Sequence, residues 1–511
     1  MFESKNSLQL SDYAQLQLSQ EEMRRFGYKV IDTIIEHSVV LKDKPVVNMV
    51  GRQQMEALLR EPAPQKGAKW EDVFEQAIWD IFSHIMHMNH PRLFGWVPGP
   101  SNFVSVMADL LTTGFNITTG AWMLSSGPTQ IEIIVIDWLK EIIGFPERAG
   151  GIMVGGGSIA NLSGLTVARK IKLNDKIENA VLYFSNQAHW SNERAAYILG
   201  FSADQIRKIP VGADYCMDVE YLRQQIETDK AAGLHPFCII ANAGTTNTGA
   251  IDSLMEIYAI CEQEDMWLHV DGAYGAAASL SKEAKEMLNG IQYAHSLTVD
   301  PHKWFFQPYE VGCLLVKEDR WLAETFDMTA DYMRNLEESM NDVNFYGKGL
   351  QLTRCDRALK LWMSIKIFGL ENFSSAIDRG IKLAKYVQNL WEERDGWQVM
   401  SDARLGIVTF RYAPASLDEK MIEELNEAIA LAVADDKFAL TPTTRLNGKL
   451  VMRMCTINPR TSEEDILETV TRIQMIAKEV YNTLMVRQVV AEDTTAARVN
   501  IEYKYMQKQN N

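Results

Sequence analysis

Cysteine is scarce in this chain, and long apolar runs are absent. The 511 residues include six cysteines without CxxC spacing, three of them in apolar strand-like runs. This usage excludes a disulfide framework or a zinc site and indicates reduced thiols in a cytoplasmic protein. No run of 18 apolar residues occurs, and the N-terminus is polar and acidic. We therefore expect an unexported protein with no membrane span and no membrane partner.

Basic residues are in deficit as well. The chain has 51 lysines and arginines against 67 acidic residues, a net charge of −16. Nucleic acids and anionic membranes attract basic surfaces, so neither is an expected partner. We find no internal repeat and no low-complexity tract. The 47% hydrophobic content is ample for a large core.

The sequence pattern divides the chain into three parts. Residues 1–85 are expected to be helical, because Ser19–Glu22 forms a capping box and Met23–Val40 shows apolar spacing of helical period. In residues 86–380, strand-like runs alternate with helical patterns, which predicts a mainly parallel sheet with crossover helices. Residues 381–511 are expected to form a smaller α/β domain. The strand candidates are Val181–Phe184, Phe237–Ala241, Trp267–Val270, Leu297–Val299, Gly312–Val316, Gly406–Tyr412 and Leu450–Cys455.

The segment Asp300-Pro-His-Lys-Trp304 gives the strongest chemical signal. The apolar run Ile291–Val299 before it is predicted to be a strand, and Pro301 turns the chain just past its end. Lys303 is thereby expected at the carboxyl edge of a sheet, where open α/β sheets bind ligands. A partly desolvated amine at that edge can form a Schiff base with an aldehyde. A surface lysine on a turn is the alternative interpretation of Lys303 alone.

Three further segments bring polar groups to predicted strand ends. Trp267–Tyr274 presents Asp271, an anionic partner suited to a protonated pyridine nitrogen. Ala180–Ser191 presents an imidazole, that of His189, in the same way. Gly151–Arg169 is typical of a strand, a glycine-rich turn and a helix, whose first backbone N–H groups and dipole favour a phosphate.

Gly155–Ala160 also fits the G-x-G-x-x-A fingerprint of nucleotide-binding proteins. A nucleotide-binding oxidoreductase is therefore a remote alternative. That interpretation leaves Lys303, Asp271 and His189 unexplained at three other strand ends.

The spacing of His84, His87 and His90 suggests a metal site as another alternative. These positions drift around a helix, and Pro91 ends it at once. No carboxylate or cysteine at matching spacing completes a ligand set, so we expect no metal.

In their order along the chain, these motifs resemble the group II pyridoxal-phosphate-dependent decarboxylases, and among them the aromatic-L-amino-acid decarboxylase-like branch. The resemblance implies an α/β protein of fold type I, which is aspartate aminotransferase-like. It implies a mainly parallel seven-stranded sheet in a large domain, an N-terminal helical segment and a small C-terminal α/β domain. It also implies a homodimer with its active site at the subunit interface. The match is carried by Asn186–His189, Gly244–Thr246, His269–Tyr274, Asp300–Trp304, Arg357–Trp362 and Asn458–Thr461.

The resemblance implies pyridoxal 5'-phosphate (PLP) as the cofactor. Lys303 would hold the cofactor aldehyde, Asp271 would keep the ring nitrogen protonated, and His189 would lie on the ring face near the substrate carboxylate. Backbone N–H groups and a hydroxyl would bind the phosphate. The remaining cofactor-binding residues by this resemblance are Gly157, Ser158, Thr246, Ala273, Asp300 and His302.

Asp300 departs from the animal aromatic decarboxylases, which carry Asn at this position. Asn can donate a hydrogen bond to phosphate, whereas ionised Asp cannot. Many bacterial-type relatives look like this chain at that position, so we do not treat Asp300 as disabling.

The family carries a tyrosine on a loop that returns a proton to the substrate Cα after carbon dioxide leaves. The matching stretch runs from Tyr332 to Gly349, and its predicted donor is Tyr346. If Phe345 takes the donor's place, the resemblance shifts towards aldehyde synthases, which lack that tyrosine.

The substrate segment of the family corresponds to His90–Asn102, with Gly114–Trp122 supplied from the other subunit. Phe94, Trp96 and Trp122 offer flat apolar surface that suits an aromatic side chain, although they could equally be core. The resemblance adds Pro98, and Arg453 as the arginine near the substrate carboxylate.

These observations predict PLP-dependent decarboxylation of an L-amino acid to its amine and carbon dioxide. Aromatic substrates lead: tryptophan, tyrosine, DOPA or phenylalanine. A diamino or acidic substrate (2,4-diaminobutyrate, glutamate or cysteine sulfinate) is the first alternative. Oxidative decarboxylation to an aromatic aldehyde is the second.

Overall fold

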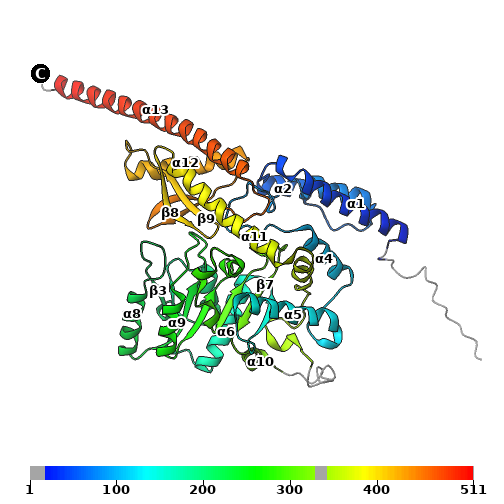
Figure 1. Ribbon diagram of the computed structural model, residues 1–511. Helices are drawn as coiled ribbons and strands as arrows, with labels where there is room; N and C mark the ends of the chain where they lie inside the picture. The colour runs from blue at the N-terminus through cyan, green and yellow to red at the C-terminus, as the bar shows by residue number, and fades with distance from the viewer. Residues whose placement is uncertain (1–15, 17, 329–341, 510–511) are drawn as a thin grey trace, which may run out of the picture. The chain divides into compact units, whose positions relative to one another are not determined.

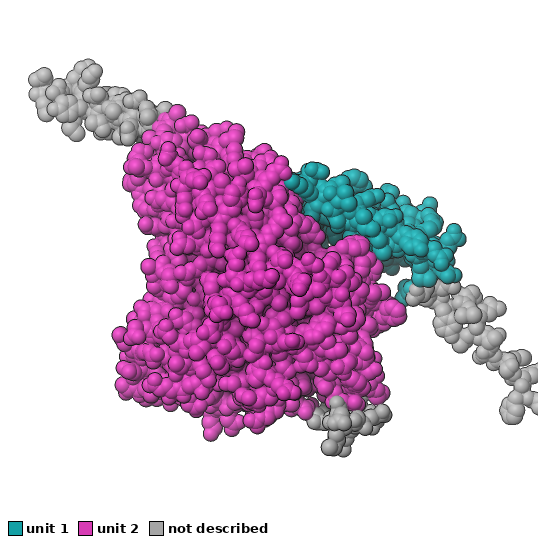
Figure 2. All heavy atoms as spheres, viewed as in Figure 1, with its two compact units in different colours: residues 1–87 teal, residues 88–511 magenta. Residues whose placement is uncertain are grey.

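The computed structural model describes residue 16 and residues 18–328 and 342–509, with side chains up to residue 486 (Figure 1). The chain divides into two compact units, Met1–His87 and Met88–Asn511 (Figure 2). None of the described helices combines the length and apolarity needed to cross a bilayer.

The first unit is helical where it is described. Its α-helices are α1 (Gln20–Val39), α2 (Arg52–Leu59) and α3 (Trp70–Gln76). The predicted capping box is confirmed: Ser19 Oγ accepts from Glu22 N–H, and the Glu22 carboxylate accepts from Ser19 N–H. Because the cap satisfies these orphan N–H groups, α1 begins directly after Ser19.

The second unit contains the predicted seven-stranded, mainly parallel sheet. Its order is β1-β7-β6-β5-β4-β2-β3. The pairs along β6-β5-β4-β2-β3 are parallel, and β7 is antiparallel to both of its neighbours. The strands are β1 (Gly150–Val154), β2 (Ala180–Ser185), β3 (Ile206–Ile209), β4 (His235–Asn242), β5 (Trp267–Asp271), β6 (Ser296–Val299) and β7 (Gly312–Val316).

The strand directions bring the functional segments to one edge of this sheet. Strands β2, β4, β5 and β6 are parallel, so their carboxyl ends lie at the same edge. Strand β1 has the same direction as β6, because each of them is antiparallel to β7. The turn from β1 into α6 (Gly157–Leu173) therefore lies at this edge too.

One predicted strand is wrong in its first half. Within the run Ile291–Val299, residues Ile291–Tyr293 form a 3₁₀ turn, and only Ser296–Val299 form β6. Gly290, at φ 106°, begins the turn, and the turn buries Ile291. Because Ile291 in the turn is buried, it is apolar like the strand residues, and the apolar run in the sequence is therefore longer than the strand.

Helices cover both faces of the sheet in a doubly wound arrangement (Figure 1). Helix α6 packs against β6 and β7, while α8 and α9 pack against β4. Strands β1, β2, β5, β6 and β7 are buried along their whole length, as expected for a sheet covered on both faces. The other helices of this part are α4 (Phe103–Gly114), α5 (Ser126–Ile143), α7 (Trp190–Ile198), α8 (Val219–Ala231), α9 (Leu254–Gln263) and α10 (Arg320–Phe326).

A second, four-stranded sheet has the order β10-β11-β9-β8. Strands β9 (Ile407–Tyr412) and β11 (Lys449–Cys455) were predicted, whereas β8 (Trp397–Arg404) and β10 (Thr443–Leu446) were not. Helix α11 (Leu359–Glu392) kinks at Gly369 and packs against both α4 and β8, which links the two sheets. Helices α12 (Glu419–Asp436) and α13 (Glu463–Gln509) complete this part.

A buried ion pair fixes the segment around Thr119. Arg354 Nη2 lies 2.6 Å from Glu132 Oε1, with side chains 1% and 0% exposed. The same guanidinium donates to the carbonyl oxygens of Thr119 and Met153, and Glu132 also accepts from Met153 N–H. Arg354 thereby ties β1, α5 and the Thr119 segment together.

We expect Arg354→Met to lower the free energy of unfolding by about 3–5 kcal/mol, because it leaves the Glu132 carboxylate buried without its cation. Denaturant titration monitored by tryptophan fluorescence measures the loss. The matched control is Arg148→Met, which removes the exposed pair with Glu318 and should cost no more than about 1 kcal/mol. Equal losses in the two variants would contradict the stabilising role of the buried pair.

Candidate active site

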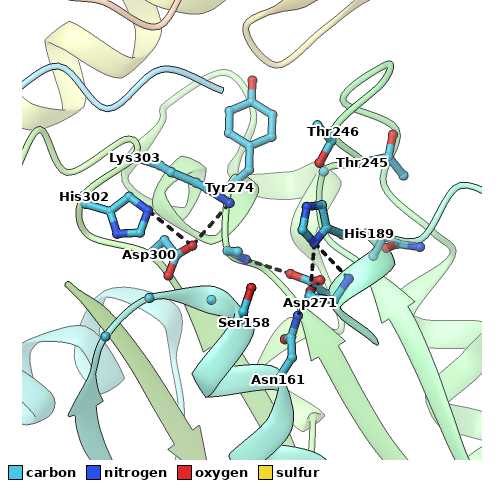
Figure 3. Close-up of a pocket in the computed structure, with 17 residues that line it drawn as sticks. Ser158, Asn161, His189, Thr245, Thr246, Asp271, Tyr274, Asp300, His302 and Lys303 are labelled. Carbon is cyan, nitrogen blue, oxygen red and sulfur yellow. Dashed lines mark hydrogen bonds and ion pairs between the residues drawn. The ribbon is translucent and has the colours of Figure 1, made fainter. Parts of the chain in front are cut away.

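A cavity of about 270 Å³ opens at the carboxyl edge of the seven-stranded sheet. All nine residues predicted to bind the cofactor line it, and Figure 3 shows that they come from separate segments of the chain. They are Gly157, Ser158, His189, Thr246, Asp271, Ala273, Asp300, His302 and Lys303.

The glycine-rich turn keeps one wall of the cavity open. Gly156 has φ 104°, a conformation that favours glycine, and it leads directly into α6. A Cβ at Gly157 would lie 2.6 Å from Asp300 Oδ2, so any larger residue would displace that carboxylate. The first N–H groups of α6, those of Gly157 and Ser158, precede the hydrogen bonds to the Gly156 carbonyl oxygen, which begin at Ile159, and they lie at the positive end of the helix dipole. This wall can therefore bind an anion.

Lys303 and Asp300 form an ion pair inside the cavity. Lys303 Nζ lies 3.2 Å from Asp300 Oδ2, and His302 Nε2 lies 3.6 Å from the same oxygen. Asp300 Oδ1 is buried without a hydrogen-bond partner among the described residues. Burial lowers the pKa of His302, whose Nδ1 is 2.6 Å from the Val311 carbonyl oxygen. The neutral ring therefore carries its proton on Nδ1 and donates it to that carbonyl.

Asp271 is buried at the end of β5, with its carboxylate held by several donors. Its Oδ2 accepts from Asn161 Nδ2 at 2.9 Å and from Asn192 Nδ2 at 2.8 Å, and its Oδ1 accepts from Ala273 N–H at 3.2 Å. Burial alone would raise the pKa of Asp271, but the charge of Lys303 and the bond from Asn192 outweigh it and lower the pKa. Asp271 is therefore ionised at neutral pH.

His189 is the N-cap residue of α7. Its Nδ1 accepts from Ser191 N–H at 3.3 Å and lies 2.7 Å from Ser191 Oγ. Burial lowers the pKa of His189 and outweighs the opposite effect of the Asp271 carboxylate. The neutral ring therefore carries its proton on Nε2, which is free to donate to a ligand.

Arg453 lies behind the cavity wall and is fully buried. Its Nη1 donates to the Trp96 carbonyl oxygen at 2.5 Å, and its Nη2 donates to the Thr246 carbonyl oxygen at 2.7 Å. Its Nε has no hydrogen-bond partner among the described residues. The arginine thus joins the predicted substrate segment to the cavity wall at Thr246.

The structure does not bring the other predicted substrate residues into this cavity. Phe94 is fully buried in the core around the second sheet, which matches its interpretation as core. Pro98 is buried, Trp96 is 51% exposed and Trp122 is half-buried. None of them lines the cavity.

Tyr346, the predicted proton donor, is also outside the cavity. It lies in a 3₁₀ turn and is 7% exposed, and its backbone N–H donates to the Gly120 carbonyl oxygen. Phe345, beside it, is buried as well. Tyr332, the other tyrosine of that stretch, lies outside the described residues.

Sequence reasoning missed several residues of the lining, including Asn161, Ser191 and Asn242. Asn161 follows Gly157 by one turn of α6 and therefore lies on the same helix face. Ser191 begins α7 beside His189, and Asn242 ends β4. Two features of the sequence could have indicated these residues: a position at a strand end, and a position one helical turn after the glycines.

The residues present fit PLP. The helix N-terminus can bind the phosphate, Asp271 supplies an anion for the ring nitrogen, and Lys303 supplies the amine for the aldehyde. Asp300 Oδ1 and the Nε2 proton of His189 leave unsatisfied hydrogen-bonding capacity in the cavity. In the described part of the chain, no group of three or more His, Cys, Asp or Glu side chains is placed to bind a metal ion.

Comparisons with known proteins agree with this chemistry. Residues 53–413 match the family model described as "Pyridoxal-dependent decarboxylase conserved domain". The chain is 46% identical over 467 residues to the aromatic-L-amino-acid decarboxylase of Bacillus atrophaeus, covering 91% of this chain and 97% of that protein. It is 28% identical over 470 residues to the phenylacetaldehyde synthase of Arabidopsis thaliana, covering 89% of this chain and 96% of that protein.

Among solved structures, the crystal structure of Oryza sativa TDC with PLP and tryptamine superposes with a TM-score of 0.87. It covers 91% of this chain and 99% of its own, at 24% identity, and so supports the fold. The matched family model spans well over half of the chain and excludes the oxidoreductase alternative. The chain therefore belongs to the pyridoxal-dependent decarboxylase family, and it is a PLP-dependent amino-acid decarboxylase of fold type I.

Proposed function

We propose that this enzyme converts an aromatic L-amino acid to its amine and carbon dioxide in the cytoplasm. The observation that carries the proposal is the 46% identity, over 91% of the chain, to a bacterial aromatic-L-amino-acid decarboxylase. The exposed ring of Trp96 and the half-buried ring of Trp122 add flat apolar surface for such a side chain.

Bound PLP supplies an electron sink that stabilises negative charge at the substrate Cα. Asp271 would hold a proton on the cofactor ring nitrogen, because its carboxylate is ionised although buried. Lys303 would provide the amine that the substrate displaces. Before that, Asp300 holds the Lys303 amine at 3.2 Å and sets its position.

The anion-binding wall would hold the cofactor phosphate. Gly157 and Ser158 contribute the first N–H groups of α6, and Ser158 adds a hydroxyl. Thr246 adds a second hydroxyl on the opposite side of the cavity (Figure 3). Ala273 donates its N–H to Asp271, so its contribution is to orient that carboxylate. His302 lines the cavity beside Asp300.

His189 would orient the substrate carboxylate, and Arg453 would act from behind the cavity wall by fixing the Trp96 and Thr246 carbonyl oxygens. His189 presents its Nε2 proton to the cavity, and Arg453 has an unpaired Nε–H behind Thr246. Fixing the carboxylate so that its bond to Cα is perpendicular to the cofactor ring selects decarboxylation, and such orientation contributes several kcal/mol to catalysis.

We further propose a homodimer whose active sites are completed across the interface. Trp122 and Tyr346 lie together in one protomer but away from its own cavity: Trp122 N–H donates to Asn344, and Tyr346 N–H donates to Gly120. Apolar side chains are also exposed in the chain segment 110–124, as on an interface, namely Leu110, Leu111, Phe115, Met123 and Leu124. In a dimer, the segments that carry Trp122 and Tyr346 would complete the active site of the partner subunit. The buried residues Phe94 and Pro98 would support the Trp96 segment.

The substrate class is tested by a panel of L-amino acids assayed for carbon dioxide, amine, aldehyde and peroxide. We expect at least one of tryptophan, tyrosine, DOPA and phenylalanine to exceed diaminobutyrate, glutamate and cysteine sulfinate by about 100-fold or more in kcat/KM, because apolar walls leave the second charge of the latter unpaired. Amine and carbon dioxide should form in equal amounts. A preference for an acidic or diamino substrate would refute the proposal, and aldehyde with peroxide would favour the synthase activity named for the Arabidopsis relative.

Lys303→Ala should abolish turnover and covalent retention of PLP, because Lys303 is the one lysine among the described residues that line the cavity. Borohydride reduction followed by peptide mapping identifies the modified lysine. The matched control is Lys317→Ala, since Lys317 follows β7 and therefore lies at the opposite edge of the sheet. Reduced cofactor on a peptide without Lys303 would refute the assignment.

Tyr346→Phe tests the predicted proton donor. If its hydroxyl protonates Cα, the amine should fall by about 10²–10⁴-fold, while carbon dioxide release falls less and aldehyde and peroxide appear. Product analysis with the preferred substrate measures the partition. A Tyr346→Phe enzyme that forms amine at the parent rate would exclude this tyrosine, and Tyr332→Phe would then be compared in the same assay.

A further inference from the structure

A chain of buried polar side chains leads from Asp271 into the sheet. Trp267 Nε1 lies 2.8 Å from Ser296 Oγ, and Ser296 Oγ lies 2.8 Å from His269 Nδ1. His269 Nε2 lies 3.1 Å from Asn161 Oδ1, whose Nδ2 is 2.9 Å from Asp271 Oδ2. All four side chains before Asp271 are at most 1% exposed. Since water does not reach them, their hydrogen bonds must satisfy one another.

The two ends of this chain fix the direction of every hydrogen bond in it. The Trp267 indole can only donate, so Ser296 Oγ accepts from it and is free to donate its own proton to His269 Nδ1. The ionised Asp271 carboxylate can only accept, so Asn161 presents its amide nitrogen there and its oxygen to His269. His269 must then carry its proton on Nε2. All donors thus point towards Asp271.

The surroundings of His269 agree with a single proton on the ring. Burial lowers the pKa of His269 to about 4, so the imidazole is neutral at neutral pH. A second donor, Thr298 Oγ, lies 2.6 Å from Asn161 Oδ1 and holds the amide in the same orientation. Figure 3 shows Asn161 on α6 with its amide directed at Asp271.

We propose that Asn161 and His269 are positioning residues that hold Asp271 ionised and in one orientation towards the cofactor ring nitrogen. The inference rests on the role proposed above for Asp271. Asn161 belongs to the same helix as the phosphate-binding turn, one turn further on. His269 precedes Asp271 by two residues in β5 and lies on the same face of the strand. One helix and one strand thereby fix both ends of the cofactor relative to each other.

The first experiment measures the tautomer of His269 in the parent enzyme with PLP bound. Solid-state ¹⁵N NMR of protein labelled at its nine histidines distinguishes a protonated Nε2 from a protonated Nδ1. The His269 signals are those that vanish in His269→Gln. We expect Nε2 to be protonated. A parent enzyme with the proton on Nδ1 would overturn the inference.

The second experiment follows the cofactor ring nitrogen. In Asn161→Leu reconstituted with PLP that is ¹⁵N-labelled in the ring, we expect the signal to shift towards the unprotonated form. We also expect kcat to fall by about 10–100-fold with little change in KM, because a charge-assisted hydrogen bond is lost. The matched control is Ser163→Ala, which alters a buried hydroxyl of α6 that has no hydrogen-bond partner among the described residues.

The outcomes separate the inference from the proposed function. An Asn161→Leu enzyme that matches Ser163→Ala in ring-nitrogen signal and kcat would overturn the positioning role. If the parent enzyme shows the expected tautomer but releases no carbon dioxide from any amino acid, the hydrogen-bond chain stands and the proposed function fails. The tautomer is measured in the parent enzyme, so poor folding of a variant does not leave the inference undecided.

Discussion

The active site depends on keeping one carboxylate, Asp271, ionised inside the protein. Burying an isolated charge is costly, and a carboxyl in an apolar setting would take up a proton. The fold offsets this cost with two side-chain amides, one backbone N–H and the charge of Lys303. Asn161 and Asn192 come from two different helices, so this compensation exists only when α6 and α7 are packed in place.

The sheet topology explains how so many groups reach one small volume. Parallel strands β2, β4, β5 and β6 end at one edge of the sheet. Strand β7 is antiparallel to both β6 and β1, so β1 ends at the same edge. Each strand end therefore contributes a short segment to the cavity. The glycine turn before α6 completes it, because a side chain at Gly157 would collide with Asp300. Asp300, whose charge is unfavourable beside a phosphate, pairs with Lys303 in the structure.

The two halves of the site differ in how they are built. The residues proposed to bind the cofactor line one cavity of this chain with backbone N–H groups, hydroxyls and paired charges. The aromatic residues proposed for the substrate, by contrast, lie outside that cavity. The bridge between them is Arg453, which bonds to the carbonyl oxygens of Trp96 and Thr246. By holding these two carbonyl oxygens, the Arg453 guanidinium fixes the position of the Trp96 segment relative to the cavity wall at Thr246.

The residue patterns predicted most strands of the large sheet, and the resemblance to a known family supplied the fold type and nine of the residues that line the cavity. Strand ends, turns and glycines are local features of a sequence, and a residue at the carboxyl end of a parallel strand lies at one known edge of the sheet. The sequence did not distinguish the 3₁₀ turn at Ile291 from the strand after it, because Ile291 is buried like the residues of the strand. Only the tertiary structure placed Tyr346 away from the cavity and joined Trp267, Ser296, His269 and Asn161 to Asp271. Such contacts depend on packing between elements that are far apart in the chain, and no local pattern records them.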